Sequence, residues 1–232
     1  MNKALIFDLD GTLVLTEKYH AQAFSAALAP YSIPYSYKEH LAKYTGRGNQ
    51  EILTLKLKEA GQPLSLLPKL SEAKKLAYNL LIDRLGVPLV EGAEKFLKEA
   101  HSKKLILAIA TSTTKANAET LMEKTGFGKY FKAIISREDV ERTKPCPDIF
   151  IAAAREIKEK PEETVVLEDS PRGIEAASRG GFATVALTTT STRKALLAKG
   201  ADLVVKDFSK IALKTILRLT NQNRKGQAQS AC

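Results

Sequence analysis

Short apolar runs alternate along most of this chain with longer segments in which apolar residues recur every three or four positions. Six of these runs, three to six residues long, are rich in Val, Ile, Leu and Ala, and span residues 3–7, 105–110, 133–135, 164–167, 183–187 and 202–205. Such runs are typical of strands that are buried on both faces of a parallel sheet. The helical patterns between them fit βαβ crossovers. The chain is therefore predicted to have an α/β fold with a Rossmann-like parallel-sheet core.

One region breaks this alternation, because residues 15–86 contain no strand-like run. The spacing there predicts four helices, over Glu17–Ala29, Tyr37–Tyr44, Asn49–Ala60 and Pro68–Leu85. Proline and glycine residues separate these helices. We interpret residues 15–86 as an inserted α-helical cap domain, residues 1–14 and 87–220 as the catalytic core, and the polar stretch 221–232 as a flexible tail.

The composition is that of a globular protein, with 44% hydrophobic and 27% charged residues in 232. This balance argues against a disordered chain. No apolar stretch approaches the ~20 residues of a membrane span, and the first residues lack a secretory pattern. We therefore expect a cytoplasmic protein without a membrane partner, and leave open whether it is a monomer or a homodimer.

The charge is strongly positive, since 36 lysines and arginines outnumber 26 acidic residues and give a net charge of +10. A basic protein attracts either nucleic acid or anionic metabolites. The basic residues are scattered along the chain, although 193–225 is the most lopsided stretch. This distribution favours solvated helix faces, and a non-catalytic nucleic-acid-binding module is kept only as a remote alternative.

Polar residues follow the ends of several predicted strands. They are Asp8 and Asp10 after the first, Thr111 and Ser112 after the second, and Glu168 and Asp169 after the fourth. In open parallel sheets the ligand crevice lies beyond the carboxyl ends of the strands. We therefore expect these side chains to converge on one site.

The segment Asp8-Leu9-Asp10-Gly11-Thr12 offers two carboxylates on one side of an extended chain. One of them can attack phosphorus and form an acyl phosphate. The other can protonate the leaving oxygen and later take a proton from water. A solvated acidic strand end is the alternative interpretation of this segment.

Two further acids, Glu168 and Asp169, end a buried strand, where carboxylates are costly unless they serve a cation. Mg²⁺ prefers oxygen ligands, and Asp8, the Asp10 carbonyl, Asp169 and a substrate phosphate would suit it. The alternative is the start of a helix at Ser170-Pro171, whose dipole favours acids. Both interpretations can hold together.

Lys144 opens the segment Lys-Pro-Cys-Pro-Asp-Ile-Phe, in which two prolines stiffen a loop before a helix that begins near Asp148. A buried ammonium there would balance the negative cluster and hold a phosphoryl group; a surface lysine is the alternative. Thr111 and Ser112 can bind phosphoryl oxygens through hydroxyl and N–H groups. Their alternative role is to cap a helix that begins near Thr114.

Together, DLDGT, a strand ending in Thr-Ser, KPCPDIF and EDS, in this order, resemble the haloacid dehalogenase superfamily over roughly residues 3–208. The KPCPDIF and EDSPRGIEAA segments are similar to the branch that holds β-phosphoglucomutases and phosphoglycolate phosphatases, and the insert looks like its C1-type cap. The resemblance implies Asp8 as nucleophile, Asp10 as acid/base and Thr111 as phosphate binder. It also implies Lys144 as charge balancer, and Glu168 and Asp169 around Mg²⁺.

The resemblance leaves open what accepts the phosphoryl group, since water gives a phosphatase and a sugar hydroxyl gives a mutase. Thr16 and His20 match a Thr and a His of the mutases just inside the cap, but related phosphatases have a similar His. In Gly46-Arg47 the arginine directly follows the glycine, unlike the mutase pattern G-x-S-R. The mutases also have a Ser-Lys-Asn run after their second motif. In this chain residues 113–117, Thr-Thr-Lys-Ala-Asn, contain a Lys and an Asn that are not at the matching positions.

These two departures favour a Mg²⁺-dependent phosphatase that acts on a small phosphate monoester, a sugar phosphate or related metabolite. A β-phosphoglucomutase-type mutase is the alternative. Arg47 has two interpretations. It can contact an anionic group of the substrate, because its guanidinium suits carboxylate or phosphate. Alternatively, it is a solvent-exposed residue at the start of a helix.

Overall fold

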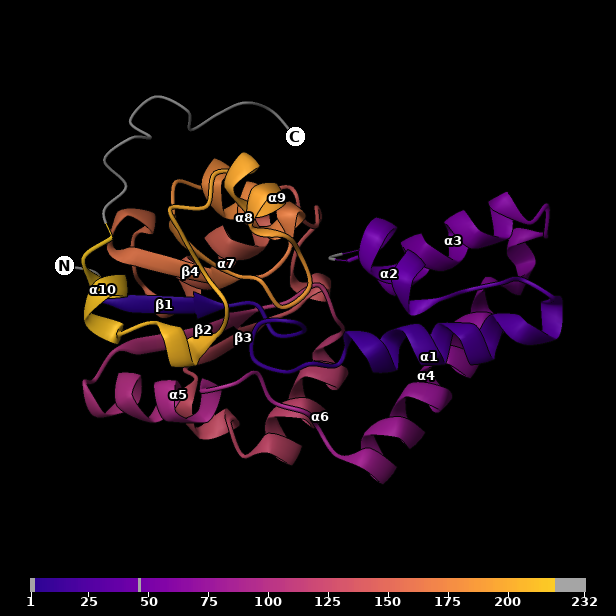
Figure 1. Ribbon diagram of the computed structural model, residues 1–232, viewed down its shortest axis with the longest axis horizontal. Helices are drawn as coiled ribbons and strands as arrows, with labels where there is room; N and C mark the ends of the chain where they lie inside the picture. Colours follow the sequence, from indigo (N-terminus) through magenta and orange to yellow (C-terminus); the bar gives the residue numbers. More distant parts are fainter. Residues whose placement is uncertain (1–2, 46, 220–232) are drawn as a thin grey trace. The chain divides into compact units, whose positions relative to one another are not determined.

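The computed structural model describes residues 3–45 and 47–219 of the chain (Figure 1). It divides into two compact units: unit 1 spans Met1–Leu15 and Leu89–Cys232, and unit 2 spans Thr16–Pro88. The predicted tail, residues 221–232, lies outside the described residues. None of the described helices is both long and apolar enough to cross a membrane.

Unit 1 is built on a parallel sheet of six strands in the order β3-β2-β1-β4-β5-β6. The strands are β1 (Ala4–Phe7), β2 (Ile106–Ala110), β3 (Ala133–Ile135), β4 (Thr164–Glu168), β5 (Ala183–Leu187) and β6 (Leu203–Val205). Each predicted run matches its strand to within one residue at either end. The predicted α/β class with a parallel sheet is thereby confirmed.

Helices cover both faces of this sheet, with α7 and α8 on one face and α5 and α6 on the other (Figure 1). The α-helices of unit 1 are α5 (Ala93–Ser102), α6 (Lys115–Thr125), α7 (Asp148–Ile157), α8 (Pro171–Arg179), α9 (Arg193–Ala198) and α10 (Leu213–Leu217). Its 3₁₀ turns are Gly128–Tyr130, Arg137–Asp139, Pro161–Glu163 and Phe208–Lys210. The double cover explains why the strands are continuous apolar runs and do not alternate with polar residues.

Successive residues of β1 serve the two faces in turn. Ile6 belongs to the cluster that packs against Phe150 and its neighbours on α7. Phe7 points the other way, and its ring centroid lies 6.2 Å from that of Phe96 on α5 and 5.8 Å from that of Phe131. All four strand residues are fully buried. This packing fixes the end of β1, from which the next residue, Asp8, projects.

Unit 2 consists of the helices α1 (Glu17–Leu28), α2 (Tyr37–Lys43), α3 (Asn49–Glu59) and α4 (Leu67–Leu85), with 3₁₀ turns at Ala29–Tyr31 and Leu64–Leu66. The four helices agree with the predicted ranges to within one residue at either end. Their apolar faces enclose a separate core that includes Phe24, Tyr35 and Leu53. Unit 2 therefore has the core of an independent helical module.

Candidate active site

The carboxyl ends of three neighbouring strands lie level at one edge of the sheet. In the register of β1 with β2 and β4, Phe7 is aligned with Ile109 on one side and with Leu167 on the other. The N–H of Asp8 continues the ladder and donates to the Leu167 carbonyl at 2.9 Å. The chain runs outward from β1 through β2 to β3 and then crosses to β4. This edge is thus the topological switch point, where open α/β sheets bind ligands.

Lys144 lies at the centre of this edge and is almost completely buried, with 1% of its surface exposed. Its ammonium donates to Asp8 Oδ1 at 2.5 Å, to Glu168 Oε1 at 2.9 Å and to the Ala110 carbonyl at 3.2 Å. An ammonium has three donors, and these three acceptors use all of them. Residues that end β1, β2 and β4 are thereby joined by one side chain.

The backbone and stem of Lys144 are held as firmly as its charged end. Its carbonyl accepts a hydrogen bond from the Arg172 guanidinium of α8. Its ammonium lies 4.8 Å from the ring centroid of Phe150, on α7. The Lys144–Pro145 peptide bond is cis. Contacts with α7 and α8 therefore hold the loop before α7 in place, so that the Lys144 ammonium lies at the strand ends.

The buried charges shift one another's protonation. The pKa of Asp8 is raised to about 8 in total. Burial raises this pKa most, the Lys144 charge lowers it, and the Glu168 and Asp10 charges raise it. Burial lowers the pKa of Lys144, but the adjacent Asp8 and Glu168 charges outweigh burial and raise it above its usual value. Lys144 is therefore the charged partner, and Asp8 is the group whose ionisation depends on the cations around it.

Glu168 is bound on both sides of its carboxylate. Oε1 accepts from Lys144, and Oε2 accepts from the N–H groups of Asp169 and Ser170 at 2.7 and 2.6 Å. The carboxylate folds back over the start of α8, where a Cβ on Gly173 would lie 1.6 Å from Oε1. Only glycine at position 173 leaves room for this arrangement.

Asp169 points toward the loop that follows β1. Its Oδ1 accepts from the Thr12 hydroxyl at 2.9 Å, and its Oδ2 accepts from the Thr190 hydroxyl. A Cβ on Gly11 would lie 2.2 Å from Oδ2, and Gly11 has a φ of +85°, which favours glycine. Space and backbone conformation both explain the glycine of the DGT sequence.

Asp10 is half-buried and lies in the tight loop that returns to Val14, whose carbonyl accepts from the Gly11 N–H at 2.7 Å. Its charge is close enough to Asp8 to raise the pKa of that carboxyl. The two carboxylates of the DLD sequence thus have different surroundings, one buried beside the ammonium and one on the more open side.

Thr111 and Ser112 follow β2 at the same edge. Thr111 is buried, and its hydroxyl accepts from the N–H of Thr113 at 3.2 Å. The Ser112 hydroxyl is buried and bonds to no described group. The helix cap that we considered for these two residues belongs to Thr114, whose hydroxyl accepts from the Asn117 N–H. Capping by Thr111 or Ser112 was therefore a wrong alternative, because α6 begins further along, at Lys115.

The donors at this edge suit a hard divalent cation. Within residues 3–45 and 47–219, no three His, Cys, Asp or Glu side chains are gathered as a metal site, because Asp8 and Glu168 turn to Lys144 and Asp169 turns to the threonines. One ammonium nevertheless serves two buried carboxylates, and Asp169 adds a third that is 1% exposed. Carboxylate and carbonyl oxygens are the ligands that Mg²⁺ prefers. Asp8, the Asp10 carbonyl and Asp169, with Glu168 beside them, are the groups that would hold it.

Two of the predicted substrate contacts, Thr16 and His20, belong to unit 2. Thr16 is fully buried, and its carbonyl accepts from the His20 N–H at the start of α1. The His20 ring stacks on Tyr78 with centroids 4.3 Å apart, and its Nδ1 lies 2.7 Å from the Lys74 ammonium. Lys74 is itself 3% exposed, and no sequence pattern distinguished it from the many other lysines.

The loop before α3 carries the other two predicted contacts. Gly46 lies outside the described residues. The Arg47 guanidinium pairs with Glu51, and its Nε donates to the Lys43 carbonyl at 3.0 Å. The side chain is about one third exposed. Arg47 thus bonds to residues of α2 and α3, the two helices that flank it. This arrangement fits the interpretation of Arg47 as a residue at the start of a helix.

Sequence reasoning missed four residues that hold the site together. They are Thr12 and Thr190, which bind Asp169, Arg172, which binds the Lys144 carbonyl, and Thr189, which donates to the Gly11 carbonyl. Thr12 is the last residue of DLDGT, so its motif gave a signal that could have been used. The others lie far along the chain from the groups they bind, and no spacing rule connects them.

Comparison with known proteins gives consistent matches over most of the chain. The sequence model of the family described as haloacid dehalogenase-like hydrolase matches residues 5–187. Validoxylamine A 7'-phosphate phosphatase of Streptomyces hygroscopicus subsp. limoneus is 31% identical and aligns over 91% of this chain and 96% of its own length. Phosphorylated carbohydrates phosphatase of Thermotoga maritima is 31% identical, over 88% and 94%. The crystal structure of CbbY from Rhodobacter sphaeroides in complex with phosphate is 28% identical, with a TM-score of 0.82, and covers 93% of this chain and 99% of that one.

Proposed function

This chain belongs to the haloacid dehalogenase-like hydrolases, and from that membership we propose that it is a Mg²⁺-dependent phosphatase acting through an aspartyl-phosphate on Asp8. Its substrate is a small phosphate monoester, and Asp10 is the general acid and base. Relatives named as phosphatases of validoxylamine A 7'-phosphate and of phosphorylated carbohydrates support a sugar phosphate or a similar polyol phosphate.

The observation that carries the proposal is the bonding of the buried Lys144 to Asp8 and Glu168 at the level ends of β1 and β4. A carboxylate is a poor nucleophile toward an anionic ester, because the two negative charges repel each other. The ammonium offsets that repulsion and fixes the direction of Asp8. Bound Mg²⁺ would neutralise further negative charge and keep Asp8 ionised.

The reaction proceeds in two displacements. The Asp8 carboxylate forms a bond to phosphorus while the bond from phosphorus to the ester oxygen breaks, and protonated Asp10 gives its proton to the leaving alkoxide. Asp10, now ionised, takes a proton from water as the water oxygen attacks the same phosphorus. The acyl-phosphate bond breaks, Asp8 is regenerated and inorganic phosphate leaves. Thr111 and Ser112 would donate to the phosphoryl oxygens, and the unpaired Ser112 hydroxyl supports that role.

Water is the proposed acceptor, and two contacts support it over a sugar hydroxyl. The Lys115 ammonium donates to the Ile134 carbonyl at 2.5 Å, and the Asn117 amide donates to Thr113 at 2.9 Å. Lys115 and Asn117, which resemble the Lys and Asn of the mutase run, are thus both engaged in half-buried hydrogen bonds within unit 1. Arg47 is similarly paired with Glu51. Unit 2 would serve as the cap that selects the alcohol.

A phosphate-release screen over a panel of sugar phosphates, nucleotides and phosphoglycolate, with Mg²⁺ or with EDTA, tests the proposal. Turnover that requires Mg²⁺ and disappears in Asp8→Asn, with an unchanged circular dichroism spectrum, is the expected result. Phosphate release that persists in Asp8→Asn would refute the nucleophile. Conversion of β-glucose 1-phosphate to glucose 6-phosphate in the presence of a bisphosphate primer would instead establish the mutase.

A further inference from the structure

The loop between β5 and α9, residues 188–192, reaches the site from a strand that carries none of the motif residues. Two adjacent threonines in it are half-buried, and each makes a hydrogen bond to a different site loop. Thr189 donates to the Gly11 carbonyl at 2.5 Å, and Thr190 donates to the Asp169 carboxylate. The loop therefore joins the segment after β1 to the segment after β4.

The Thr190 contact fixes the direction of the Asp169 carboxylate. Thr190 Oγ1 lies close to Asp169 Oδ2 and 3.2 Å from the Asp169 carbonyl. On the opposite side, the Thr12 hydroxyl donates to Oδ1 at 2.9 Å. The α-carbon of Gly11 closes the space, since a Cβ there would meet Oδ2 at 2.2 Å. The carboxylate is therefore confined by two hydroxyls and a glycine, which fix the direction in which its oxygens point.

We infer that Thr190 is a positioning residue for the metal ion, holding Asp169 in the orientation in which it binds a divalent cation. The inference rests on the proposed function, because Asp169 is a metal ligand only in that proposal. Hydrogen bonds to the ligands of a metal commonly set its affinity, and their removal weakens binding about 10- to 100-fold. Thr190 supplies this bond from a loop that no motif of the chain marks.

Mg²⁺ titration of the full-length, EDTA-treated protein by calorimetry tests the inference without any substrate. In Thr190→Val the hydroxyl is lost and the shape is kept, so the dissociation constant for Mg²⁺ should rise about tenfold or more. Thr190→Ser keeps the hydroxyl and should restore binding to the wild-type value. The matched control is Thr192→Val in the same loop, because the Thr192 hydroxyl caps α9 and accepts from the Ala195 N–H at 3.3 Å. The Mg²⁺ affinity of this variant should not change.

Equal Mg²⁺ affinity in Thr190→Val and wild type would overturn the inference, as would a Thr190→Ser protein as weak as Thr190→Val. If near-UV circular dichroism shows that Thr190→Val is not folded, Thr190→Ala takes its place with the same expected weakening. Wild-type protein that binds no Mg²⁺ would also overturn it. If the wild-type protein hydrolysed none of the phosphate esters, the proposed function would be refuted. A higher dissociation constant for Mg²⁺ in Thr190→Val would still support the role of this residue.

Discussion

At the scale of single residues, the site depends on a lysine that few other side chains could replace. Lys144 directs three N–H groups from one nitrogen to three acceptors on different strand ends. The planar fork of an arginine could not converge on the same points. A neutral side chain would leave Asp8 and Glu168 buried without their cation, and an unpaired buried charge costs several kcal/mol. The identity of this residue is therefore set by both stability and chemistry.

Gly173 is the residue at which a single added methyl group should be most damaging to this arrangement. Its Cβ would lie 1.6 Å from Glu168 Oε1, the atom that accepts from Lys144. In Gly173→Ala the carboxylate must turn away, and Lys144 loses one of its acceptors. We expect kcat/KM for phosphate release to fall by at least about tenfold, or ~1.4 kcal/mol in the barrier. Crowding should also lower the free energy of unfolding by about 1–3 kcal/mol.

The matched control is Gly128→Ala, the same substitution in a 3₁₀ turn of unit 1. A Cβ on Gly128 would meet nothing closer than Met122 Cβ, at 3.7 Å. Turnover of this variant should equal that of the wild type when both are measured as initial rates with one substrate. Full activity in Gly173→Ala would contradict the role given to the Glu168 orientation.

At the scale of elements, the site follows from strands that end level. Because β1, β2 and β4 are in register, polar residues that follow apolar runs in the sequence meet at one edge.

Another feature at this scale lies in unit 2, where α1 and α2 are joined by a buried chain of three hydrogen-bonded side chains. His40 Nε2 donates to Glu17, and its Nδ1 lies 2.7 Å from the Tyr35 hydroxyl. All three side chains are buried.

Breaking this chain at its centre should destabilise unit 2. His40→Ala removes the partner of Glu17, whose side chain is 11% exposed. It also removes the partner of Tyr35, so two buried polar groups lose a hydrogen bond. We expect the free energy of unfolding to fall by about 3 kcal/mol, the order found when one member of a buried pair is removed. Urea denaturation of the full-length protein, followed by far-UV circular dichroism, measures this change.

His101→Ala is the control for that substitution, since His101 is exposed on α5 and its ring meets the Tyr130 ring edge-on, with centroids 5.5 Å apart. Its urea midpoint should lie close to that of the wild type. If His40→Ala and His101→Ala shift the midpoint equally, the buried chain contributes no specific stability.

The strands and helices could be predicted from the sequence because each has a local signal. A strand buried on both faces is a continuous apolar run, and the helices of unit 2 have apolar residues at helical spacing. Asp8 and Glu168 could be proposed because strand ends are where a parallel sheet binds ligands. Lys144 could be proposed because two prolines stiffen the loop that it opens before a helix. Thr190 could not, since it meets Asp169 across 21 residues and only the fold brings the two together. The orientation of Glu168 toward Lys144 likewise depends on the small size of Gly173. No pattern in the sequence links this glycine to Glu168.

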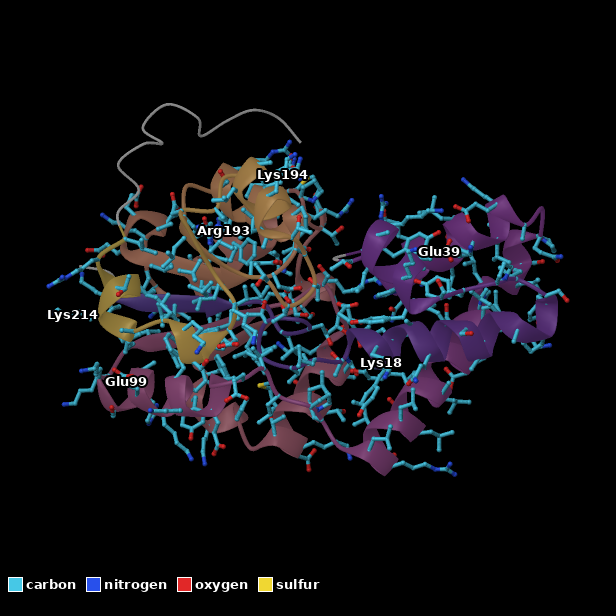
Figure 2. The ribbon with its side chains drawn as sticks, viewed as in Figure 1. Lys18, Glu39, Glu99, Arg193, Lys194 and Lys214 are labelled. Atoms are coloured by element: carbon cyan, nitrogen blue, oxygen red, sulfur yellow. The ribbon has the colours of Figure 1, made fainter. Side chains whose placement is uncertain are left out.

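At the scale of the whole molecule, the net charge of +10 comes from basic residues that are scattered along the sequence. Figure 2 shows Lys194 on α9 and Lys214 on α10 at well separated positions of unit 1. Several other cations are paired with acids, as Lys199 is with Glu175 at 2.7 Å. A diffuse positive field of this kind attracts small anions without forming a dedicated surface for a polyanion.

This field should appear as a salt dependence of KM. Raising the ionic strength from about 0.01 M to about 0.15 M shortens the Debye length from ~30 Å to ~8 Å, which screens the attraction of a doubly charged phosphate ester. We expect KM to rise by about threefold or more, within the range of electrostatic steering. The value of kcat should stay constant, because Lys144 is buried beyond the reach of such screening. Initial rates over this salt series measure both constants, and the constancy of kcat is the internal control.

A KM that does not change with salt would contradict this role of the positive field. If the protein released no phosphate and was retained on duplex DNA in a salt-sensitive way, a nucleic-acid-binding module would be favoured instead, because counterion release dominates that kind of binding.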